Sequence, residues 1–369
     1  MTSRSIDLVL LPGDGVGPEV VASAGKVLTA VGRIFELSIA AEPLLIGGAA
    51  VDAYGTALRP ADLERCKAAD AVLLGAVGGP KWDDPAARVR PEQGLLALRR
   101  GMGLFANLRP VSVVPALADR APIKRHLLDG VDIMVVRELT GGIYFGRPRS
   151  TWHERRGRVA VDTLTYREYE IERICQLAYD LAAARNGKLT SVDKANVLDT
   201  SRLWRSVVSQ MASAYPAVTL DHVLIDAMTM HLIQGPSRFD VIVTENMFGD
   251  ILTDEASVLA GSIGLLPSAS IGATRTTSDK RRRGVFEPIH GSAPTIAGKG
   301  LANPVGTILS LALLFRLALA REDVAVAIES AVSHVIAANM RTPDIADDET
   351  RVVSTEEFGE EVAARLVRP

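Results

Sequence analysis

The sequence is poor in cysteine. Cys66 and Cys175 are the only two among 369 residues, which is too few for a disulfide framework or a zinc motif of the usual spacing. A reducing compartment is therefore expected, with the cytoplasm as the default. The chain also lacks an excess of charge of one sign: its formal net charge is −3, which gives no general attraction to nucleic acid or to a membrane surface.

Long apolar runs are absent as well. The longest, residues 308–320, contains Arg316 and is shorter than the roughly 20 residues that a membrane-spanning helix needs. The apolar segment at the N-terminus is too short for a signal peptide, and no small-residue cleavage pattern follows it. The sequence therefore predicts a soluble protein without a membrane partner.

Several catalytic motifs are missing. There is no G-x-S-x-G elbow, no H-E-x-x-H pair and no C-x-x-C pair, so neither a hydrolase nor a zinc enzyme is indicated. The AGKG segment at 297–300 departs from a P-loop, because Ala293 stands where the first glycine belongs and Gly300 where Ser or Thr must hold magnesium. The glycines at 13, 15 and 17 do not follow the G-x-G-x-x-G spacing, so a plain tight turn is favoured over a dinucleotide fingerprint.

What the sequence does contain is an alternation of short apolar runs with helical periodicity. The apolar runs predict buried strands at 6–11, 71–74, 131–136, about 188–193, 219–225 and in the first half of 239–254. Their alternation with helices indicates an α/β protein, and 369 residues with 47% hydrophobic content predict a large core divided into two domains. Thr165 with Glu168 predicts a capping box at the start of one helix. Ligands bind at the carboxyl ends of strands in open α/β sheets, and four charged residues follow predicted strands: Arg137, Lys194, Asp226 and Asp250.

The stretch 239–254 passes from an apolar run into a segment that carries Asp250 and Asp254. Carboxylates four residues apart lie on one face of a helix, where they repel each other unless a cation or the helix N-terminus is near. Such a pair suits Mg²⁺ or Mn²⁺. Taken alone, the stretch favours two solvated acids over a metal site.

A second group of candidates mixes arginines with leucines between residues 95 and 109. Guanidinium groups match carboxylates in a bidentate manner, so this mixture suits a substrate with acidic and aliphatic parts. An amphipathic helix with solvated arginines explains the pattern equally well. The basic run 280–283 lacks interleaved aromatic residues, so a solvated loop is preferred there to a nucleic-acid site.

Nine blocks along the chain together resemble the isocitrate/isopropylmalate family of β-decarboxylating dehydrogenases. They are LPGDGVGPEV, GAVGGPKWD, EQGLLALR, FANLRP, VRELTGGIYFG, VDKANVLDTSRLWR, TENMFGDILTDEASVL, GSIGLLPSAS and FEPIHGSAPTIAGKGLANP. EQGLLALR and RELTGGIYFG are most specific to the isopropylmalate branch. The resemblance implies a two-domain α/β fold of the isopropylmalate dehydrogenase type, distinct from the standard Rossmann arrangement. Its second domain, 105–260, carries substrate, metal and dimerisation surfaces and is inserted in a cofactor-side domain, 1–104 and 261–369.

The resemblance also implies roles for individual residues in a homodimer with shared active sites. Leu95 and Leu96 would line the isopropyl pocket, and three arginines would bind the malate carboxylates: Arg99, Arg109 and Arg137. Asp250, Asp254 and the partner subunit's Asp226 would hold Mg²⁺ or Mn²⁺. Tyr144 and the partner subunit's Lys194 would transfer protons. NAD would be bound by Glu287, His290, Gly291, Ser292, Ala293 and Asn303.

The reaction implied is NAD-dependent oxidative decarboxylation of (2R,3S)-3-isopropylmalate to 4-methyl-2-oxopentanoate in leucine biosynthesis. A paralogue acting on another 3-substituted malate is the alternative, whereas isocitrate is disfavoured because its third carboxylate needs a polar partner where the two leucines stand. The sequence departs from the family at Thr295, where NAD-using members carry aspartate, and in a longer loop at 275–283.

Overall fold

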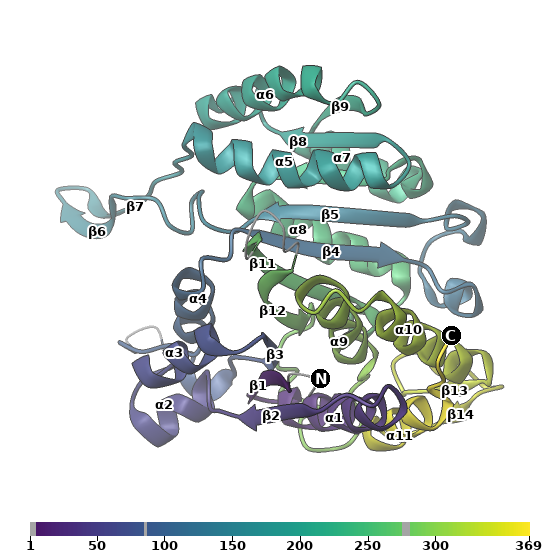
Figure 1. Ribbon diagram of the computed structural model, residues 1–369. Coiled ribbons are helices and arrows are strands. Elements are labelled where there is room, and N and C mark those ends of the chain that lie inside the picture. Colours follow the sequence, from purple (N-terminus) through teal and green to yellow (C-terminus); the bar gives the residue numbers. More distant parts are fainter. Residues whose placement is uncertain (1–4, 85–86, 275–280) are drawn as a thin grey trace. The chain divides into compact units, whose positions relative to one another are not determined.

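The computed structural model describes residues 5–84, 87–274 and 281–369 (Figure 1). The chain forms two compact units, one of Met1–Leu104 with Gly261–Pro369 and the other of Phe105–Ala260. The functional roles predicted for the two parts of the chain stay predictions. Of the predicted long loop, 275–280 lie outside the described residues. Within the described ranges, no helix is both long and apolar enough to cross a membrane.

The first unit contains five strands of sheet in the order β2-β1-β3-β12-β11. Their bounds are β1 (Ile6–Gly13), β2 (Ile39–Pro43), β3 (Ala71–Ala76), β11 (Pro267–Thr274) and β12 (Arg282–Pro288). β1, β2, β3 and β12 pair in parallel, whereas β11 pairs antiparallel with β12. All six residues of β3 are buried, as expected for a parallel strand with both faces covered. The predicted strands at 6–11 and 71–74 are therefore confirmed.

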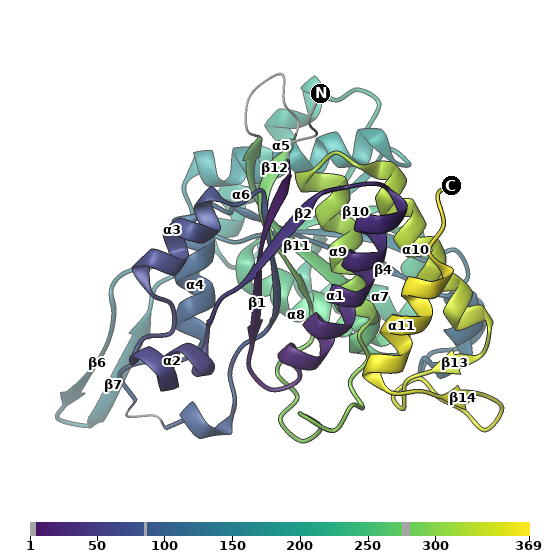
Figure 2. The ribbon, with the colours of Figure 1, turned by 60° about the horizontal axis from the view of Figure 1, so that its bottom comes forward.

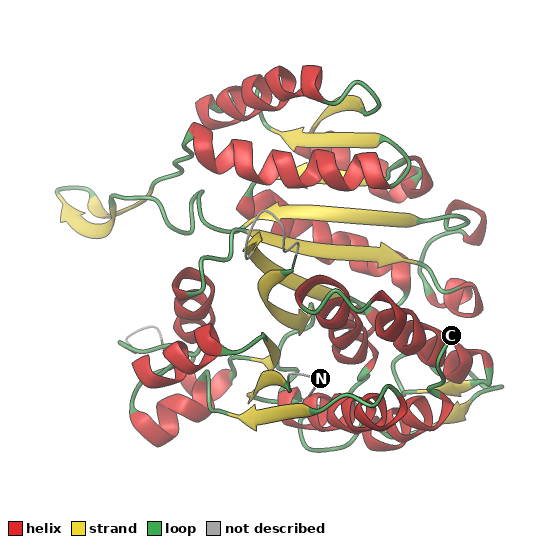
Figure 3. Cartoon of the chain, in the orientation of Figure 1, coloured by secondary structure: helices red, strands yellow, loops and turns green. Residues whose placement is uncertain are grey.

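Helices pack on this part of the sheet and on one another (Figures 2 and 3). They are α1 (Gly17–Ile34), α2 (Gly48–Tyr54), α3 (Pro60–Ala68), α4 (Glu92–Gly101), α9 (Val305–Ala318), α10 (Glu322–Ala337) and α11 (Thr355–Arg365). α1 lies beside α11, and α9 contacts β11, β12 and α10. α9 is apolar almost all round because it is buried between these neighbours. Two short strands, β13 (Met340–Arg341) and β14 (Arg351–Val352), pair in parallel near the end of this unit.

The glycine turn after β1 is organised by a buried carboxylate. Asp14 is 4% exposed and accepts hydrogen bonds from the backbone N–H groups of Gly48 at 2.7 Å, Ala49 at 2.8 Å and Gly78 at 2.8 Å. Gly13 has a φ of +70°, and a Cβ there would lie 1.9 Å from the carbonyl oxygen of Ala76. Glycine is therefore required at that position for both conformation and space.

The second unit contains five strands of sheet in the order β4-β5-β10-β8-β9. Their bounds are β4 (Ala106–Ser112), β5 (Asp132–Glu138), β8 (Lys188–Asp193), β9 (Thr219–Leu224) and β10 (Val241–Thr244). β5, β10, β8 and β9 run parallel, so their carboxyl ends share one edge, and β4 is antiparallel to β5. The strands predicted in this part of the sequence are confirmed.

The second unit also contains four α-helices and a hairpin. They are α5 (Glu168–Ala184), α6 (Asp199–Met211), α7 (Ile225–Gln234), α8 (Asn246–Ser257) and the hairpin of β6 (Arg149–Glu154) with β7 (Gly157–Asp162). The capping box predicted at Thr165 is wrong. It lies two residues later, where the backbone N–H of Arg167 donates to the Glu170 carboxylate at 2.8 Å.

Candidate active site

The centre of the candidate site is one face of α8, which begins two residues after β10 ends. Asn246, Asp250 and Asp254 follow at intervals of four residues and therefore share a stripe along the helix. Asp250 and Asp254 lie in the second and third turns, not in the first turn, so the helix N-terminus does not offset their charges. Two arginines from neighbouring strands lie against the stripe instead.

The first of these is Arg137 on β5, which is 4% exposed. Its Nε and Nη2 donate to Asn246 Oδ1 at 3.1 and 2.8 Å, and its Nη1 bonds Asp250. The aliphatic part of the side chain crosses α8 at Gly249, where a Cβ would lie 2.7 Å from Arg137 Cγ. A glycine at this position therefore allows the guanidinium to reach the stripe.

Arg109 on β4 lies farther along the same stripe and is 7% exposed. Its Nη2 is 3.5 Å from Asp250, and its Nη1 is 3.7 Å from Asp254 and bonds the Thr253 hydroxyl. Each arginine thus bridges successive members of the stripe, so two guanidinium groups offset two carboxylates. Burial raises the pKa of Asp254, as does the charge of Asp250, while Arg109 and Arg137 lower it.

Tyr144 joins this group from the turn after β5. Its hydroxyl donates to Asp250 Oδ2 at 3.1 Å. Burial is the main cause that raises the pKa of Tyr144, and the Asp250 charge adds to it, so the phenol keeps its proton at neutral pH. The turn itself is held by the buried Glu138 carboxylate, which accepts from the backbone N–H groups of Thr140 at 2.9 Å and Gly141 at 2.7 Å.

Lys194 and Asp226 form a separate pair in the second unit. Lys194 follows β8 directly, Asp226 is the second residue of α7, and Lys194 Nζ lies 2.7 Å from Asp226 Oδ1. The hydrogen bond from Lys194 lowers the pKa of Asp226. Across the described part of the chain, no three His, Cys, Asp or Glu side chains gather into a set that could hold a metal ion. The predicted metal ligand set, which takes one carboxylate from a second subunit, stays a prediction.

The first unit carries the other predicted substrate residues on α4. Leu95 packs partly buried against the hydrophobic core, whereas Leu96 is 37% exposed. Arg99 Nη2 lies 2.7 Å from Glu287 Oε1, which also accepts from the Ser270 hydroxyl at 3.3 Å. The resemblance implies that Arg99 binds substrate and Glu287 binds cofactor, and the structure joins the two side chains in one buried ion pair.

Apart from Glu287, which lies in β12, the predicted cofactor residues of the first unit lie between β12 and α9. The Ser292 carbonyl accepts from Val16 N at 2.9 Å, and Glu19 accepts from the N–H groups of Gly298 at 3.0 Å and Gly300 at 2.9 Å. These bonds join the glycine turn after β1 to the loop that contains His290, Gly291, Ser292 and Ala293. The early glycine turn therefore borders the predicted cofactor loop.

Asn303 closes this loop and is held from two sides. Its Nδ2 donates to Asp344 Oδ2 at 3.0 Å, and its Oδ1 accepts from Val305 N at 3.0 Å at the start of α9. Ser262 and Thr342 also donate to the Asp344 carboxylate. Sequence reasoning missed Asp344, since no spacing relates it to Asn303.

Sequence reasoning also missed Asn246. Its position four residues before Asp250 and eight before Asp254 was a usable signal, because the same spacing had already grouped the two acids. Arg137, whose guanidinium donates to Asn246 Oδ1, lies 109 residues earlier in the chain, so the sequence did not indicate this contact.

His290 offers a prediction about pH. Burial lowers its pKa, while the Gly291 carbonyl and the Asp344 charge act to raise it. Since the folded pKa lies below the unfolded value of about 6.5, the contribution of His290 to stability is present above that pH and is lost as pH falls through the folded pKa. We expect an NMR titration, assigned with His290→Gln, to give a pKa below 6.5. Titration at or above the unfolded value would contradict the burial that we describe.

Comparisons of the sequence and of the fold with known proteins identify the family of this chain. The isocitrate/isopropylmalate dehydrogenase family matches residues 7–362. A 3-isopropylmalate dehydrogenase of Anaeromyxobacter dehalogenans is 56% identical over 359 residues, which cover 97% of this chain and 99% of that protein. Another, of Dehalococcoides mccartyi, is 53% identical over 357 residues, 96% of this chain and 98% of the relative. The solved structure of an isocitrate dehydrogenase from Methylococcus capsulatus matches with a TM-score of 0.85 and 34% identity, covering 98% of this chain and 99% of that one.

The chain therefore belongs to the isocitrate/isopropylmalate dehydrogenase family, and it is a β-decarboxylating dehydrogenase that acts on a small-molecule substrate. Within that family, the two relatives named above, at 56% and 53% identity, bear the name 3-isopropylmalate dehydrogenase. The predictions of this family and of its mixed α/β fold are confirmed. Membership also implies a nicotinamide cofactor and a divalent metal.

Proposed function

We propose that this protein catalyses the NAD-dependent oxidative decarboxylation of (2R,3S)-3-isopropylmalate to 4-methyl-2-oxopentanoate, a step of leucine biosynthesis. The observation that carries the proposal is the pair of buried guanidiniums, Arg109 and Arg137, set against two carboxylates on one face of α8. Buried arginines are suited to bidentate recognition of carboxylates. A malate core offers two carboxylates and a hydroxyl to such a surface.

The donor set fits a hard divalent ion. Asp250 and Asp254 supply only oxygen ligands, which Mg²⁺ and Mn²⁺ prefer. The two arginines cancel the charge of the two carboxylates, so a divalent ion would leave the surface positive and attractive to a dianionic substrate. When bound, this ion would act as a Lewis acid on the substrate hydroxyl and on the oxygen that becomes negative as carbon dioxide leaves.

Two groups of the second unit are suited to move protons. Lys194, contributed by the partner subunit in our proposal, would take the proton of the substrate hydroxyl in its neutral amine form, which the metal ion and the arginines would favour by repelling an ammonium charge. The nicotinamide, when bound, would supply the hydride acceptor. Tyr144, which the raised pKa keeps protonated, would donate a proton to carbon after decarboxylation. The partner subunit's Asp226 would complete the metal ligands, so the proposal includes a cytoplasmic homodimer with shared active sites.

The first unit supplies the remaining roles. Arg99 would bind a carboxylate, Leu95 and Leu96 would contact the isopropyl group, and Glu287 would lie near the nicotinamide. The loop from His290 to Asn303 would hold the rest of NAD. His290 Nε2 supports this assignment, because it is buried and makes no hydrogen bond to any residue described here, which leaves it available to a ligand.

A panel of 3-substituted malates tests the proposal. Each malate is offered with NAD or NADP, with and without Mg²⁺ or Mn²⁺, and reduced nicotinamide is followed by its absorbance. We expect turnover of isopropylmalate with NAD and metal only. Turnover of a bulkier aryl or smaller alkyl analogue, without turnover of isopropylmalate, would instead establish the paralogous activity.

Thr295 allows a separate test of the cofactor assignment. It is exposed, and Lys299 Nζ donates to its carbonyl at 2.7 Å. A carboxylate at this position can accept from both ribose hydroxyls of NAD, so we expect Thr295→Asp to lower the Kd for NAD about tenfold. Isothermal titration would measure it, with Thr295→Asn as the uncharged control. An unchanged Kd would remove position 295 from the ribose contacts.

A further inference from the structure

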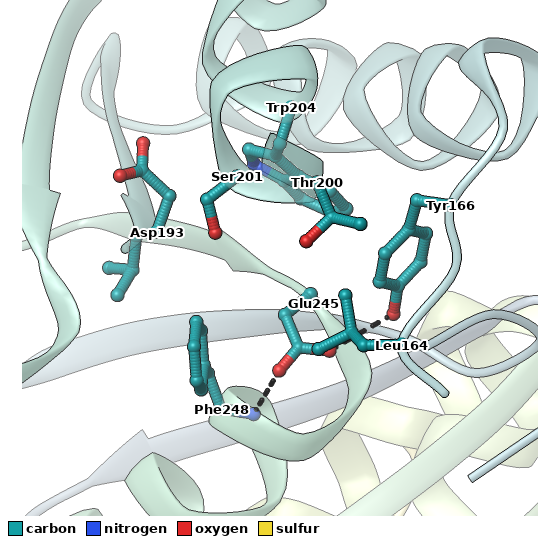
Figure 4. Close-up of a pocket in the computed structure, with 9 residues that line it drawn as sticks. Leu164, Tyr166, Asp193, Thr200, Ser201, Trp204, Glu245 and Phe248 are labelled. Atoms are coloured by element: carbon teal, nitrogen blue, oxygen red, sulfur yellow. Dashed lines mark hydrogen bonds between the residues drawn. The ribbon is translucent and has the colours of Figure 1, made fainter. Parts of the chain in front are cut away.

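The first turn of α8 is held by a buried pair, Tyr166 and Glu245 (Figure 4). The Tyr166 hydroxyl accepts from Asn246 N at 2.9 Å and donates to Glu245 Oε2 at 3.2 Å. Glu245 Oε1 accepts from Phe248 N at 2.9 Å. The N-terminal N–H groups of α8 are therefore satisfied by fixed partners, which sets the rotation of the helix about its axis.

This rotation places the side chain of Asn246 between two elements. Asn246 is 1% exposed; its Nδ2 donates to the Gly141 carbonyl at 3.2 Å, and its Oδ1 accepts both Nε and Nη2 of Arg137. The donor side of the amide is thus fixed by the turn after β5. The acceptor side consequently faces the edge of the guanidinium and fixes its plane.

The charge of residue 246 matters because of its place on the stripe. Positions 250 and 254 carry carboxylates, whereas position 246, which faces Nε and Nη2 of Arg137, carries a neutral amide. An amide oxygen orients a guanidinium without cancelling its charge. A carboxylate there would orient it as well, yet it would compete with any substrate carboxylate for the same cation.

We propose that Asn246, fixed by Tyr166, Glu245 and Gly141, is a positioning residue that aims Arg137 at a substrate carboxylate without adding a second negative charge to the one that Asp250 already places beside Arg137. The inference rests on the proposed function, since it takes the carboxylate to be that of isopropylmalate. It assigns Asn246 no contact with substrate, and its effect is exerted through Arg137.

Two substitutions separate orientation from charge. Asn246→Asp keeps the shape and the acceptor, adds a negative charge and loses the donor to the Gly141 carbonyl. We expect KM for isopropylmalate to rise about 30-fold with kcat within about threefold, as for loss of uniform binding. Asn246→Ala keeps the charge balance but frees the guanidinium plane, and we expect a rise in KM of about tenfold. Binding of isopropylmalate with Mg²⁺, measured by titration calorimetry, should weaken in the same order.

Controls distinguish this role from a structural one. NAD affinity of Asn246→Asp should match that of the wild type, and its melting temperature should fall no further than that of Asn246→Ala, which loses the same bond to the Gly141 carbonyl. Asn186→Asp adds the same charge in the second unit away from α8 and should leave KM unchanged. A wild-type KM in Asn246→Asp, or a fall in melting temperature and kcat without a change in KM, would overturn the proposal. If the wild type itself does not turn over isopropylmalate, the proposed function fails first, which is a separate result.

Discussion

Asp250→Asn is expected to reduce metal-dependent kcat/KM for isopropylmalate on the order of 10³-fold, a loss typical of removing a charged group that acts on the reacting oxygens. Asp250 accepts from Arg137 and from Tyr144, and it lies 3.5 Å from Arg109. The amide that replaces it loses one ligand oxygen and the charge between two guanidiniums. The affinity for the metal ion should therefore fall, and the Tyr144 hydroxyl should lose the carboxylate that fixes its orientation.

The measurement combines steady-state kinetics with Mn²⁺ binding followed by electron paramagnetic resonance. Asp180→Asn, an isosteric change on the exposed surface of α5, is the matched control and should behave as the wild type. Normal activity in Asp250→Asn, with unaltered Mn²⁺ binding, would remove Asp250 from the ligand set.

Asp14→Ala is expected to lower the free energy of unfolding of the first unit by about 3–5 kcal/mol, since each buried donor that loses its acceptor costs roughly 1–3 kcal/mol. Three backbone N–H groups, of Gly48, Ala49 and Gly78, share the Asp14 carboxylate. Asp14→Asn keeps one acceptor oxygen but places an amide NH₂ group against backbone N–H groups that also donate. Its loss of unfolding free energy should therefore be smaller than that of Asp14→Ala.

Denaturant unfolding and amide hydrogen exchange would test this prediction. Exchange at Gly48, Ala49 and Gly78 should accelerate in Asp14→Ala, which links the loss of stability to the named bonds. Asp52→Ala is the control, because Asp52 lies on α2 with Gly48 and Ala49. Its carboxylate forms an exposed ion pair with Lys81, so little change in stability is expected. Wild-type stability in Asp14→Ala would show that water replaces the carboxylate as acceptor.

Patterns local in the chain predicted much of the fold. Apolar runs fixed the strands, and the interval of four residues placed Asp250 and Asp254 on one face of a helix. The start of α5 was missed by two residues because Glu170, not Glu168, reaches back to a backbone N–H. Alternative caps this close in sequence differ little in free energy, so local pattern does not decide between them.

The roles of individual site residues stay predictions, but the structure changes how several are understood. The stripe of acids alone indicated solvated side chains, whereas in the fold Arg109 and Arg137 lie against it. Leu95 and Leu96 are neighbours in sequence yet differ in burial, because adjacent residues of a helix point about 100° apart.

By itself, the sequence determined the family, the α/β class and the acids of α8, since each depends on residue types at short, regular spacing. The tertiary structure alone decided which side chains meet: Arg99 with Glu287 across 188 residues, and Arg137 with Asn246 across 109. Such pairs follow from strand order and helix rotation, which are set by the packing of a whole unit. For that reason the spacing of Asn246 could indicate its place on the stripe, whereas its contact with Arg137 followed only from the folded chain.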